Sequence, residues 1–240
     1  QQVEVTDNWL HGDWPWELCY PDQSVMVGFG GKVDRYGDNV RWVPDKYVVA
    51  VPYDVLQAGY KVDSCAKIRL WRADAIDVFD FKAFNQGDYL GSVENSVTTE
   101  TISKVLYPND GTDQGKELRL KQQFFFVSAS LQDMIRSILE RGLAIEDFYQ
   151  YYQVQLNDTH PSIAVAELMR LLMDEHHLNW ELAWSITSKS IAYTNHTLLP
   201  EALEKWSVSL FEKLLPRHLE IIYEINSRFL QIVRMHYPGD

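Results

Sequence analysis

The stretches of sequence that determine the fold are YQVQLNDTHPSIAVAELMRLLMDEHH (152–177) and, shortly after it, SIAYTNHT (190–197). Each begins with a short strand pattern, and between the two strands the apolar spacing becomes that of helices, over 161–177 and 179–190. A strand, two helices and a second strand in this order predict a βαβ unit whose two strands are parallel.

Strand patterns dominate the first part of the chain. VMVGFGGKV (25–33) and VRWVPDKYVVAVPYD (40–54) predict two strands around a turn at 36–39, and KIRLWRA (67–73) predicts a third. Helical spacing returns from about Gly115, where it predicts a long helix that ends at Gly142. A long final helix is predicted after Pro216, over about 217–235.

These patterns place the chain in the α/β class, with an antiparallel β portion followed by the βαβ unit and long helices. We expect mainly strands and aromatic loops over 1–72, a loop over 73–90, and helices with the βαβ unit over 91–240.

Charge and composition exclude some classes of function. Hydrophobic residues make up 46% of the 240 residues, and the formal net charge is −12, which disfavours nucleic acid as a partner. No apolar run is long enough to span a membrane, and the first residues do not form a signal peptide. Cys19 and Cys65 lack paired spacing, so we expect a reducing, cytoplasmic location.

A polar cluster follows each predicted strand of the βαβ unit: NDTH (157–160) and TNHT (194–197). Ligands of open α/β sheets bind beyond the carboxyl ends of parallel strands, so we expect both clusters at one sheet edge. Either cluster alone is typical of a helix cap, and that alternative stays open. As a pair they favour a pocket that hydrogen-bonds a polar or polyhydroxylated ligand. The spacing of a helical metal site is absent, and no metal ligand is assigned.

The same two clusters carry a resemblance to the α-glucan (glycogen, starch or maltodextrin) phosphorylases. Further matching motifs occur in the order found in that family and extend the resemblance from about Asp7 to Asp240. The longest are QLNDTHPSIAVAELMRLLMDE (155–175), AYTNHTLLPEALEKW (192–206), KVLYPND (104–110), GKELRLKQQFF (115–125) and LLPRHLEIIYEINSRF (214–229).

The resemblance implies a fold of two Rossmann-like domains, the arrangement of two-domain type B glycosyltransferases. The chain resembles an internal part of the N-terminal domain only. In the family, pyridoxal 5′-phosphate forms a Schiff base with a lysine of the second domain, so the chain is expected to hold no cofactor-binding residue. The parent enzyme is expected to be a homodimer.

The resemblance also assigns roles to residues of the two clusters. His196 matches the histidine that contacts the glucose unit at the catalytic subsite, and Thr197 lies next to it. Asp158 and His160 match residues that line the pocket beside that glucose, whereas for Asn157 a capping or scaffolding role is equally expected.

Two further segments are matched to the substrate channel. The stretch after the second cluster borders it through Glu201, Ala202 and Glu204. The loop 73–83 matches the gate that closes the catalytic site, and we assign its acidic residue to Asp77 rather than Asp80. The paired arginines of the allosteric nucleotide site are replaced here by Arg136 followed by Ser137, so control by AMP is not expected.

The reaction implied by the resemblance is the phosphorolysis of an α-1,4-glucan, with inorganic phosphate as the second substrate and glucose 1-phosphate as the product. In this chemistry the phosphate protonates the leaving oxygen, and protein side chains position and stabilise the sugar. The isolated chain is expected to be inactive and to self-associate through exposed apolar surface. The alternative is a non-catalytic carbohydrate-binding or structural fragment.

Overall fold

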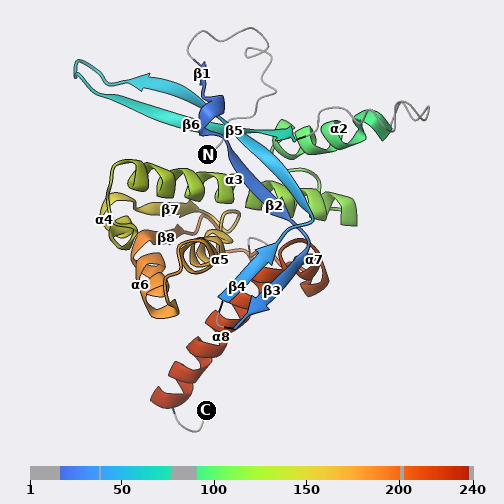
Figure 1. Cartoon of the computed structure of the whole chain (residues 1–240), viewed down its shortest axis with the longest axis vertical. Coiled ribbons are helices and arrows are strands. Elements are labelled where there is room, and N and C mark those ends of the chain that lie inside the picture. The colour runs from blue at the N-terminus through green and yellow to red at the C-terminus, as the bar shows by residue number, and fades with distance from the viewer. Residues whose placement is uncertain (1–16, 38, 77–90, 201–202, 238–240) are drawn as a thin grey trace. The chain divides into compact units, whose positions relative to one another are not determined.

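The computed structural model describes the chain over residues 17–37, 39–76, 91–200 and 203–237 (Figure 1). The chain divides into two compact units, which are described one after the other. The first comprises residues 1–28 and 47–133, and the second comprises 29–46 and 134–240. Among the described residues, no helix is long and apolar enough to cross a membrane.

The first unit is built on a four-stranded antiparallel sheet whose central strand is β5. On one side β6 pairs with β5 from Val48↔Ala75 to Ala58↔Cys65, forming the long hairpin of Figure 1. On its other side lie β1 and β2. The strands are β1 (Glu17–Cys19), β2 (Val25–Phe29), β5 (Lys46–Ala58) and β6 (Cys65–Ala75), and a single 3₁₀ turn, η2 (Pro21–Gln23), separates β1 from β2.

Arg69 on β6 holds this sheet together through buried charge. It donates two hydrogen bonds to the carboxylate of Asp54, of 2.6 and 2.7 Å, and one of 2.8 Å to Asp133. Burial alone would raise the pKa of Asp54, but the bidentate contact with Arg69 outweighs it and lowers that pKa. Asp54 therefore stays ionised although it is buried.

Two helices belong to this part of the chain, α2 (Gly91–Lys104) and α3 (Asp113–Glu140). Gln122 of α3 donates to the carbonyl oxygen of Ile102 at 2.8 Å, and the amide of Ala73 on β6 donates to Ser103 at 2.9 Å. α3 closes where predicted: Gly142 adopts a φ of +68° and its amide donates to the carbonyl of Leu139.

The predicted strands at 25–33 and 40–54 are each broken in two, which is a correction to the sequence analysis. Gly30 and Gly31 both have positive φ, and a Cβ on Gly31 would lie 1.9 Å from the carbonyl oxygen of Val43, so only glycine fits there. Pro44 has no amide hydrogen and interrupts the second stretch.

The outcome is a separate hairpin, β3 (Lys32–Tyr36) with β4 (Asn39–Val43), in the second unit. The pairing Tyr36↔Asn39 confirms the turn predicted at 36–39.

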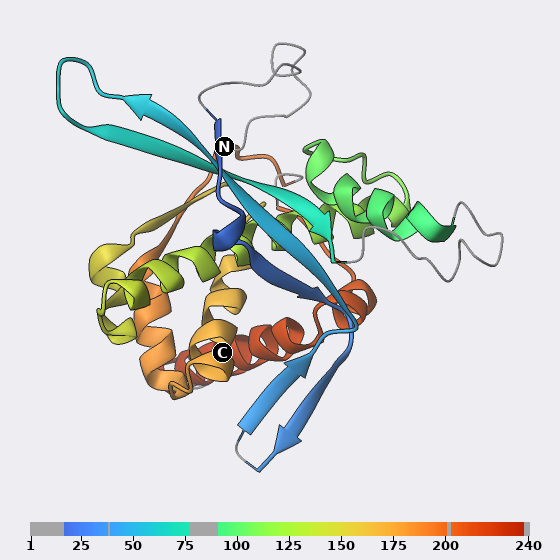
Figure 2. The same ribbon diagram turned by 45° about the horizontal axis from the view of Figure 1, so that its top comes forward.

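The predicted βαβ unit is confirmed in the second unit. β7 (Val154–Asn157) and β8 (Ile191–Thr194) are parallel and pair in register from Val154↔Ile191 to Asn157↔Thr194. The connection contains α5 (Ala164–Arg170) and α6 (Trp180–Ser190), which lie side by side (Figure 2). Before β7 the chain forms η3 (Ile145–Asp147) and α4 (Phe148–Tyr151).

The helix predicted over 161–177 is shorter than expected. Residues 161–163 form a turn, α5 begins at Ala164, and the segment η4 (Leu171–Glu175) is a π-helix. Two acidic residues of the π-helix form ion pairs. Glu175 accepts a 2.8 Å hydrogen bond from Arg170, the last residue of α5, and Asp174 accepts two hydrogen bonds of 2.8 Å from Arg217 of α8. The change from α-helix to π-helix after Arg170 therefore coincides with ion pairs to Arg170 and to Arg217.

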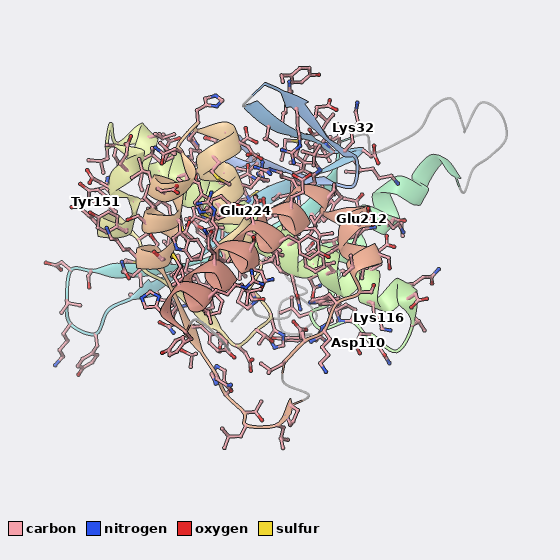
Figure 3. All side chains as sticks on the ribbon, turned by 90° about the horizontal axis from the view of Figure 1, so that it is seen from below. Lys32, Asp110, Lys116, Tyr151, Glu212 and Glu224 are labelled. Atoms are coloured by element: carbon pink, nitrogen blue, oxygen red, sulfur yellow. The ribbon has the colours of Figure 1, made fainter. Side chains whose placement is uncertain are left out.

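The last two helices of the described chain are α7 (Val208–Leu214) and α8 (Pro216–His236). A proline begins α8, as predicted. The first turns of α8 lie beside the β3–β4 hairpin, where Arg35 pairs with Glu220 at 2.8 Å. Further along α8, Arg228 donates to Glu224, labelled in Figure 3, at 2.6 Å and to Glu181 of α6 at 2.8 Å.

A buried charged cluster joins α5 to α8. Glu167 is fully buried and accepts hydrogen bonds from Arg170 at 2.7 and 3.0 Å and from Nε2 of His218 at 2.5 Å. The ring of Trp42, on the hairpin, meets His218 edge-on and also lies under the guanidinium of Arg170. This cluster connects three elements that are distant in sequence.

The charge states follow from burial and from the neighbours. Burial alone would raise the pKa of Glu167, but Arg170 and His218 outweigh it and lower that pKa to about 2. Burial lowers the pKa of His218 below its ordinary value of 6.5, so the imidazole stays neutral and donates from Nε2 to the carboxylate. Glu167 is thus the anion of the cluster and Arg170 its cation.

Replacing Glu167 by glutamine should therefore destabilise the second unit. The variant removes the fully buried counter-ion of Arg170 and leaves it only the more exposed carboxylate of Glu175, so we expect the free energy of unfolding at pH 7 to fall by about 3–5 kcal/mol. Urea denaturation measures this. Glu181→Gln removes an exposed carboxylate that pairs with Arg228 and is the control, with little expected change. Equal losses in the two variants would contradict a special role for the buried cluster.

The same cluster predicts how stability depends on pH. Both folded pKa values lie below the ordinary ones, so the unfolded chain binds more protons. The stabilisation is complete above about pH 6.5 and is lost as pH falls, first through His218 and then through Glu167 between about pH 4.5 and 2. Glu167→Gln should flatten the slope between about pH 4.5 and 2, which denaturation curves at several pH values measure.

Candidate functional site

The two polar clusters lie together at the carboxyl ends of β7 and β8. The last residues of the two strands, Asn157 and Thr194, pair with each other. The ladder continues one step further, because the amide of Asp158 donates to the carbonyl oxygen of Thr194 at 3.0 Å. The expectation that both clusters meet at one sheet edge is confirmed.

The first cluster turns sharply at Asp158. This residue has a φ of +65°, in the left-handed region that aspartate tolerates better than most side chains. Its carboxylate accepts from the amide of Thr159 at 2.7 Å, and the carbonyl of Thr159 accepts from Ser162 at 3.0 Å. The chain thereby leaves the strand and enters the turn that precedes α5.

The second cluster makes two successive local turns. The side-chain oxygen of Asn195 accepts from the amide of Thr197 at 2.7 Å, and the hydroxyl of Thr197 accepts from the amide of Leu199 at 3.1 Å. No α-helix occurs in the described residues between Thr194 and Val208. The second cluster is therefore not followed directly by an α-helix that it could cap among the described residues.

In the part of the chain that the structure describes, neither cluster caps an α-helix, contrary to the alternative that the sequence left open. The N-cap of α5 is Ile163 and makes no side-chain hydrogen bond, whereas Asn179 and Ser207 do cap α6 and α7. The polar side chains at the strand ends shape turns and face one another. Their position is consistent with a ligand site.

Two side-chain contacts connect the strands at this edge. Gln155 of β7 donates to the hydroxyl of Thr194 at 2.5 Å. One step further along the same face of β7, the side-chain oxygen of Asn157 contacts Nε2 of His196 in a short hydrogen bond. An amide oxygen only accepts hydrogen bonds, so Nε2 carries the proton.

A second imidazole lies at the site and has a carboxylate beside it. Nδ1 of His160 is 3.4 Å from Oε1 of Glu204. The His160 side chain is 33% exposed and that of Glu204 only 14%, so this carboxylate is partly shielded from water. Glu204 thus reaches the edge at which the NDTH cluster lies.

The sequence-predicted site residues fall into two groups. Five of them lie in the segments that follow the carboxyl ends of β7 and β8: Asp158, His160, His196, Thr197 and Glu204. Asp77, Glu201 and Ala202 lie outside the described residues. Arg136, at the position matched to the nucleotide site, donates to Glu140 at 2.7 Å.

Gln155 is not among the sequence-predicted site residues, and for Asn157 a capping or scaffolding role was as strongly expected as a place in the pocket. The signal that could have found them is the alternation in QVQLN (153–157), where the exposed positions are polar and the buried Leu156 is apolar. Because side chains alternate along a strand, Gln155 and Asn157 lie on the same face of β7, and Asn157 pairs with Thr194 at the carboxyl end of β8.

The site mixes hydrogen-bond donors and acceptors, as binding of a polyhydroxylated ligand requires. It offers no obvious place for a Schiff base. Every lysine in the described part of the chain is exposed except the half-buried Lys121, which pairs with Glu117 at 2.6 Å. The described residues also contain no group of three or more histidine, cysteine, aspartate or glutamate side chains that could hold a metal ion.

Comparison with known proteins identifies the family. The family model described as carbohydrate phosphorylase matches residues 1–240. The chain is 56% identical to glycogen phosphorylase of Synechocystis sp., 49% to glycogen phosphorylase 2 of Dictyostelium discoideum and 48% to the brain form of human glycogen phosphorylase. Each match covers 100% of this chain but only 29%, 25% and 29% of those relatives, so the chain spans less than a third of their length. By this match over its whole length, the chain belongs to the carbohydrate phosphorylase family.

Proposed function

We propose that the full-length protein is an α-glucan phosphorylase and that this chain supplies one wall of its glucose pocket. The observation that carries the proposal is the meeting of NDTH and TNHT at the ends of two parallel strands. Family membership and relatives named glycogen phosphorylase support it. The substrates are an α-1,4-glucan and inorganic phosphate.

The proposed reaction is a balanced exchange at one carbon of the terminal glucose. The bond from C1 to the bridging oxygen breaks, a phosphate oxygen forms the new bond to C1, and the proton carried by phosphate passes to the departing oxygen. Glucose 1-phosphate and a glucan one unit shorter result. The side chains of this chain are neither the acid nor the nucleophile in this scheme.

What the described residues contribute is positioning. His196 and Thr197 bind the hydroxyl groups of the terminal glucose, while Asp158 and His160 line the pocket beside it. Glu204 supports His160 at 3.4 Å. Hydrogen bonds placed in advance hold the reacting carbon near the phosphate and stabilise the charge that develops on the sugar.

Pyridoxal 5′-phosphate belongs to the proposal as the cofactor of the parent enzyme. The lysines described in this chain do not suit it, because each is exposed or, for Lys121, paired with Glu117. The cofactor lysine is accordingly assigned to a part of the parent that this chain does not span, and no step of the scheme above is assigned to the cofactor.

The remaining features of the proposal concern the context of the chain. We assign it to a Rossmann-like N-terminal domain, with 1–72 as the strand-rich part, 73–90 as the gate-like loop carrying Asp77, and 91–240 as the helical part with the βαβ unit. The parent is a cytoplasmic homodimer. Glu201 and Ala202 border the substrate channel.

A second candidate applies to the 240-residue chain by itself: a carbohydrate-binding fragment without catalytic activity. The observation that favours it is the exposed set of donors and acceptors at the strand ends, which needs no further group to bind a sugar weakly.

Glucose 1-phosphate release separates the two candidates. The full-length protein, incubated with glycogen and phosphate, should release glucose 1-phosphate, whereas the 240-residue chain should release none. Isothermal titration of the chain with a maltooligosaccharide measures binding without turnover. Failure of the full-length protein to form the product, together with absence of cofactor absorbance, would contradict the phosphorylase proposal.

Replacing His196 by alanine in the full-length enzyme should lower kcat by about 10²-fold, because one transition-state hydrogen bond is lost. Steady-state kinetics of glucose 1-phosphate release measure this. The matched control is His236→Ala, which removes an exposed histidine near the end of α8 that bonds the carbonyl of Ile232. If the control lost as much activity as His196→Ala, the assignment of His196 to the glucose site would be wrong.

A further inference from the structure

We infer that Asn157 is a positioning residue that fixes the orientation and the tautomer of His196. This inference rests on the proposed function only for its effect on the reaction, because the contact between the two side chains exists in the chain by itself. Asn157 is not among the residues that the family resemblance assigned to the sugar.

Backbone hydrogen bonds hold Asn157 in place independently of its side-chain contact. Asn157 is the last residue of β7 and pairs with Thr194, and the next residue, Asp158, is held in the left-handed region by its own turn. The amide of Asp158 closes the ladder on Thr194. The backbone of Asn157 is therefore held by the strand ladder on one side and by the turn at Asp158 on the other.

The loop brings His196 back towards this anchor. His196 lies two residues beyond the paired Thr194, between Asn195 and Thr197, which are joined by a 2.7 Å side-chain to backbone hydrogen bond. This local turn directs the imidazole towards β7, where Nε2 meets the side-chain oxygen of Asn157. The bond crosses from one polar cluster to the other.

The chemistry of the contact determines the tautomer. A side-chain amide oxygen has lone pairs and no hydrogen, so it bonds an imidazole nitrogen only if that nitrogen carries a proton. Nε2 of His196 is then the N–H, and in the neutral ring Nδ1 is a lone-pair acceptor. Among the described residues, no hydrogen bond reaches Nδ1, which leaves it available for a hydroxyl group.

Other roles for Asn157 do not fit the structure. It does not cap a helix, since α5 begins at Ala164 behind Ile163. It does not supply backbone strain, because the positive φ belongs to Asp158. The single side-chain hydrogen bond that the structure gives it is the one to His196.

Fixing one tautomer matters because a ring that samples both tautomers and two orientations presents a donor and an acceptor to the same hydroxyl in turn. Only one of the two tautomers suits a given sugar hydroxyl group in the reacting complex, because that group either donates a hydrogen bond to the ring or accepts one from it. Groups that orient a functional side chain in this way typically change activity by about 10- to 100-fold when they are removed. Asn157 should therefore affect kcat more than the binding of the glucan.

The tautomer is measured directly by ¹⁵N NMR of the 240-residue chain, with the His196 signal assigned through its loss in His196→Gln. Solid-state spectra of sedimented protein serve if the chain self-associates. At a pH at which the imidazole is neutral, the expected result is a proton on Nε2 and none on Nδ1. In Asn157→Leu, which keeps the side-chain size but lacks the acceptor, the ring should become a mixture of both tautomers. A proton on Nδ1 in the unchanged chain, or no change in Asn157→Leu, would overturn the inference.

A matched control lies two residues earlier on the same face of β7. Gln155→Leu removes the 2.5 Å cross-strand hydrogen bond to Thr194 but has no contact with the imidazole. It should leave the tautomer of His196 unchanged. Equal effects of Gln155→Leu and Asn157→Leu on the tautomer would show a general loosening of the strand ends and would overturn the specific role of Asn157.

In the full-length holoenzyme, Asn157→Leu should lower kcat by about 10- to 100-fold with little change in KM for the glucan, whereas the control His236→Ala should leave kcat near that of the unchanged enzyme. Thermal unfolding of each variant checks that the fold is intact. An unchanged kcat in a folded Asn157→Leu enzyme would overturn the role in the reaction. If the unchanged holoenzyme released no glucose 1-phosphate, the proposed function would fail while the NMR result still decided the tautomer.

Discussion

The pairing of β7 with β8 is the constraint on which the site depends. Side chains alternate across a strand, so a shift of one residue in this ladder would turn the polar face of β7 away from the loop that carries His196. The register is secured from inside by Leu156, which is buried, and at its end by the amide of Asp158 on Thr194. Parallel pairing then brings two clusters that are almost forty positions apart in sequence to one edge.

The charged cluster around Glu167 holds the helix that follows the first polar cluster of the site. α5 begins a few residues after the NDTH cluster, and Glu167 and Arg170 lie on the buried side of that helix. Through His218 and Trp42 the helix is attached to α8 and to the β3–β4 hairpin. A buried ion group of this kind stabilises little compared with an apolar core, but it accepts only one arrangement of its partners. It connects α5, which begins six residues after Asp158, to α8.

Sequence patterns predicted the elements well where periodicity was strong, and less well where single residues decided. The parallel strands, the long helix ending at Gly142 and the helix opened by Pro216 follow from apolar spacing and end signals. The breaks at Gly31 and Pro44 depend on which strand each half pairs with, and local pattern does not contain that information. At the site, residue types indicated the clusters, but whether they capped helices or faced each other depended on where the next helix began.

The polar site lies beside apolar side chains that water contacts directly. Leu198, which directly follows the TNHT cluster, is 100% exposed, and Leu203 is 56% exposed. When exposed apolar surface of this kind is covered, nearby hydrogen bonds become stronger, because covering removes water that competes for each polar contact. The carboxylates of Asp158 and Glu204 tolerate such shielding only if they keep their present partners, the amide of Thr159 and the imidazole of His160. The hydrogen bonds of these residues are therefore weaker in the open chain than where the surrounding surface is covered.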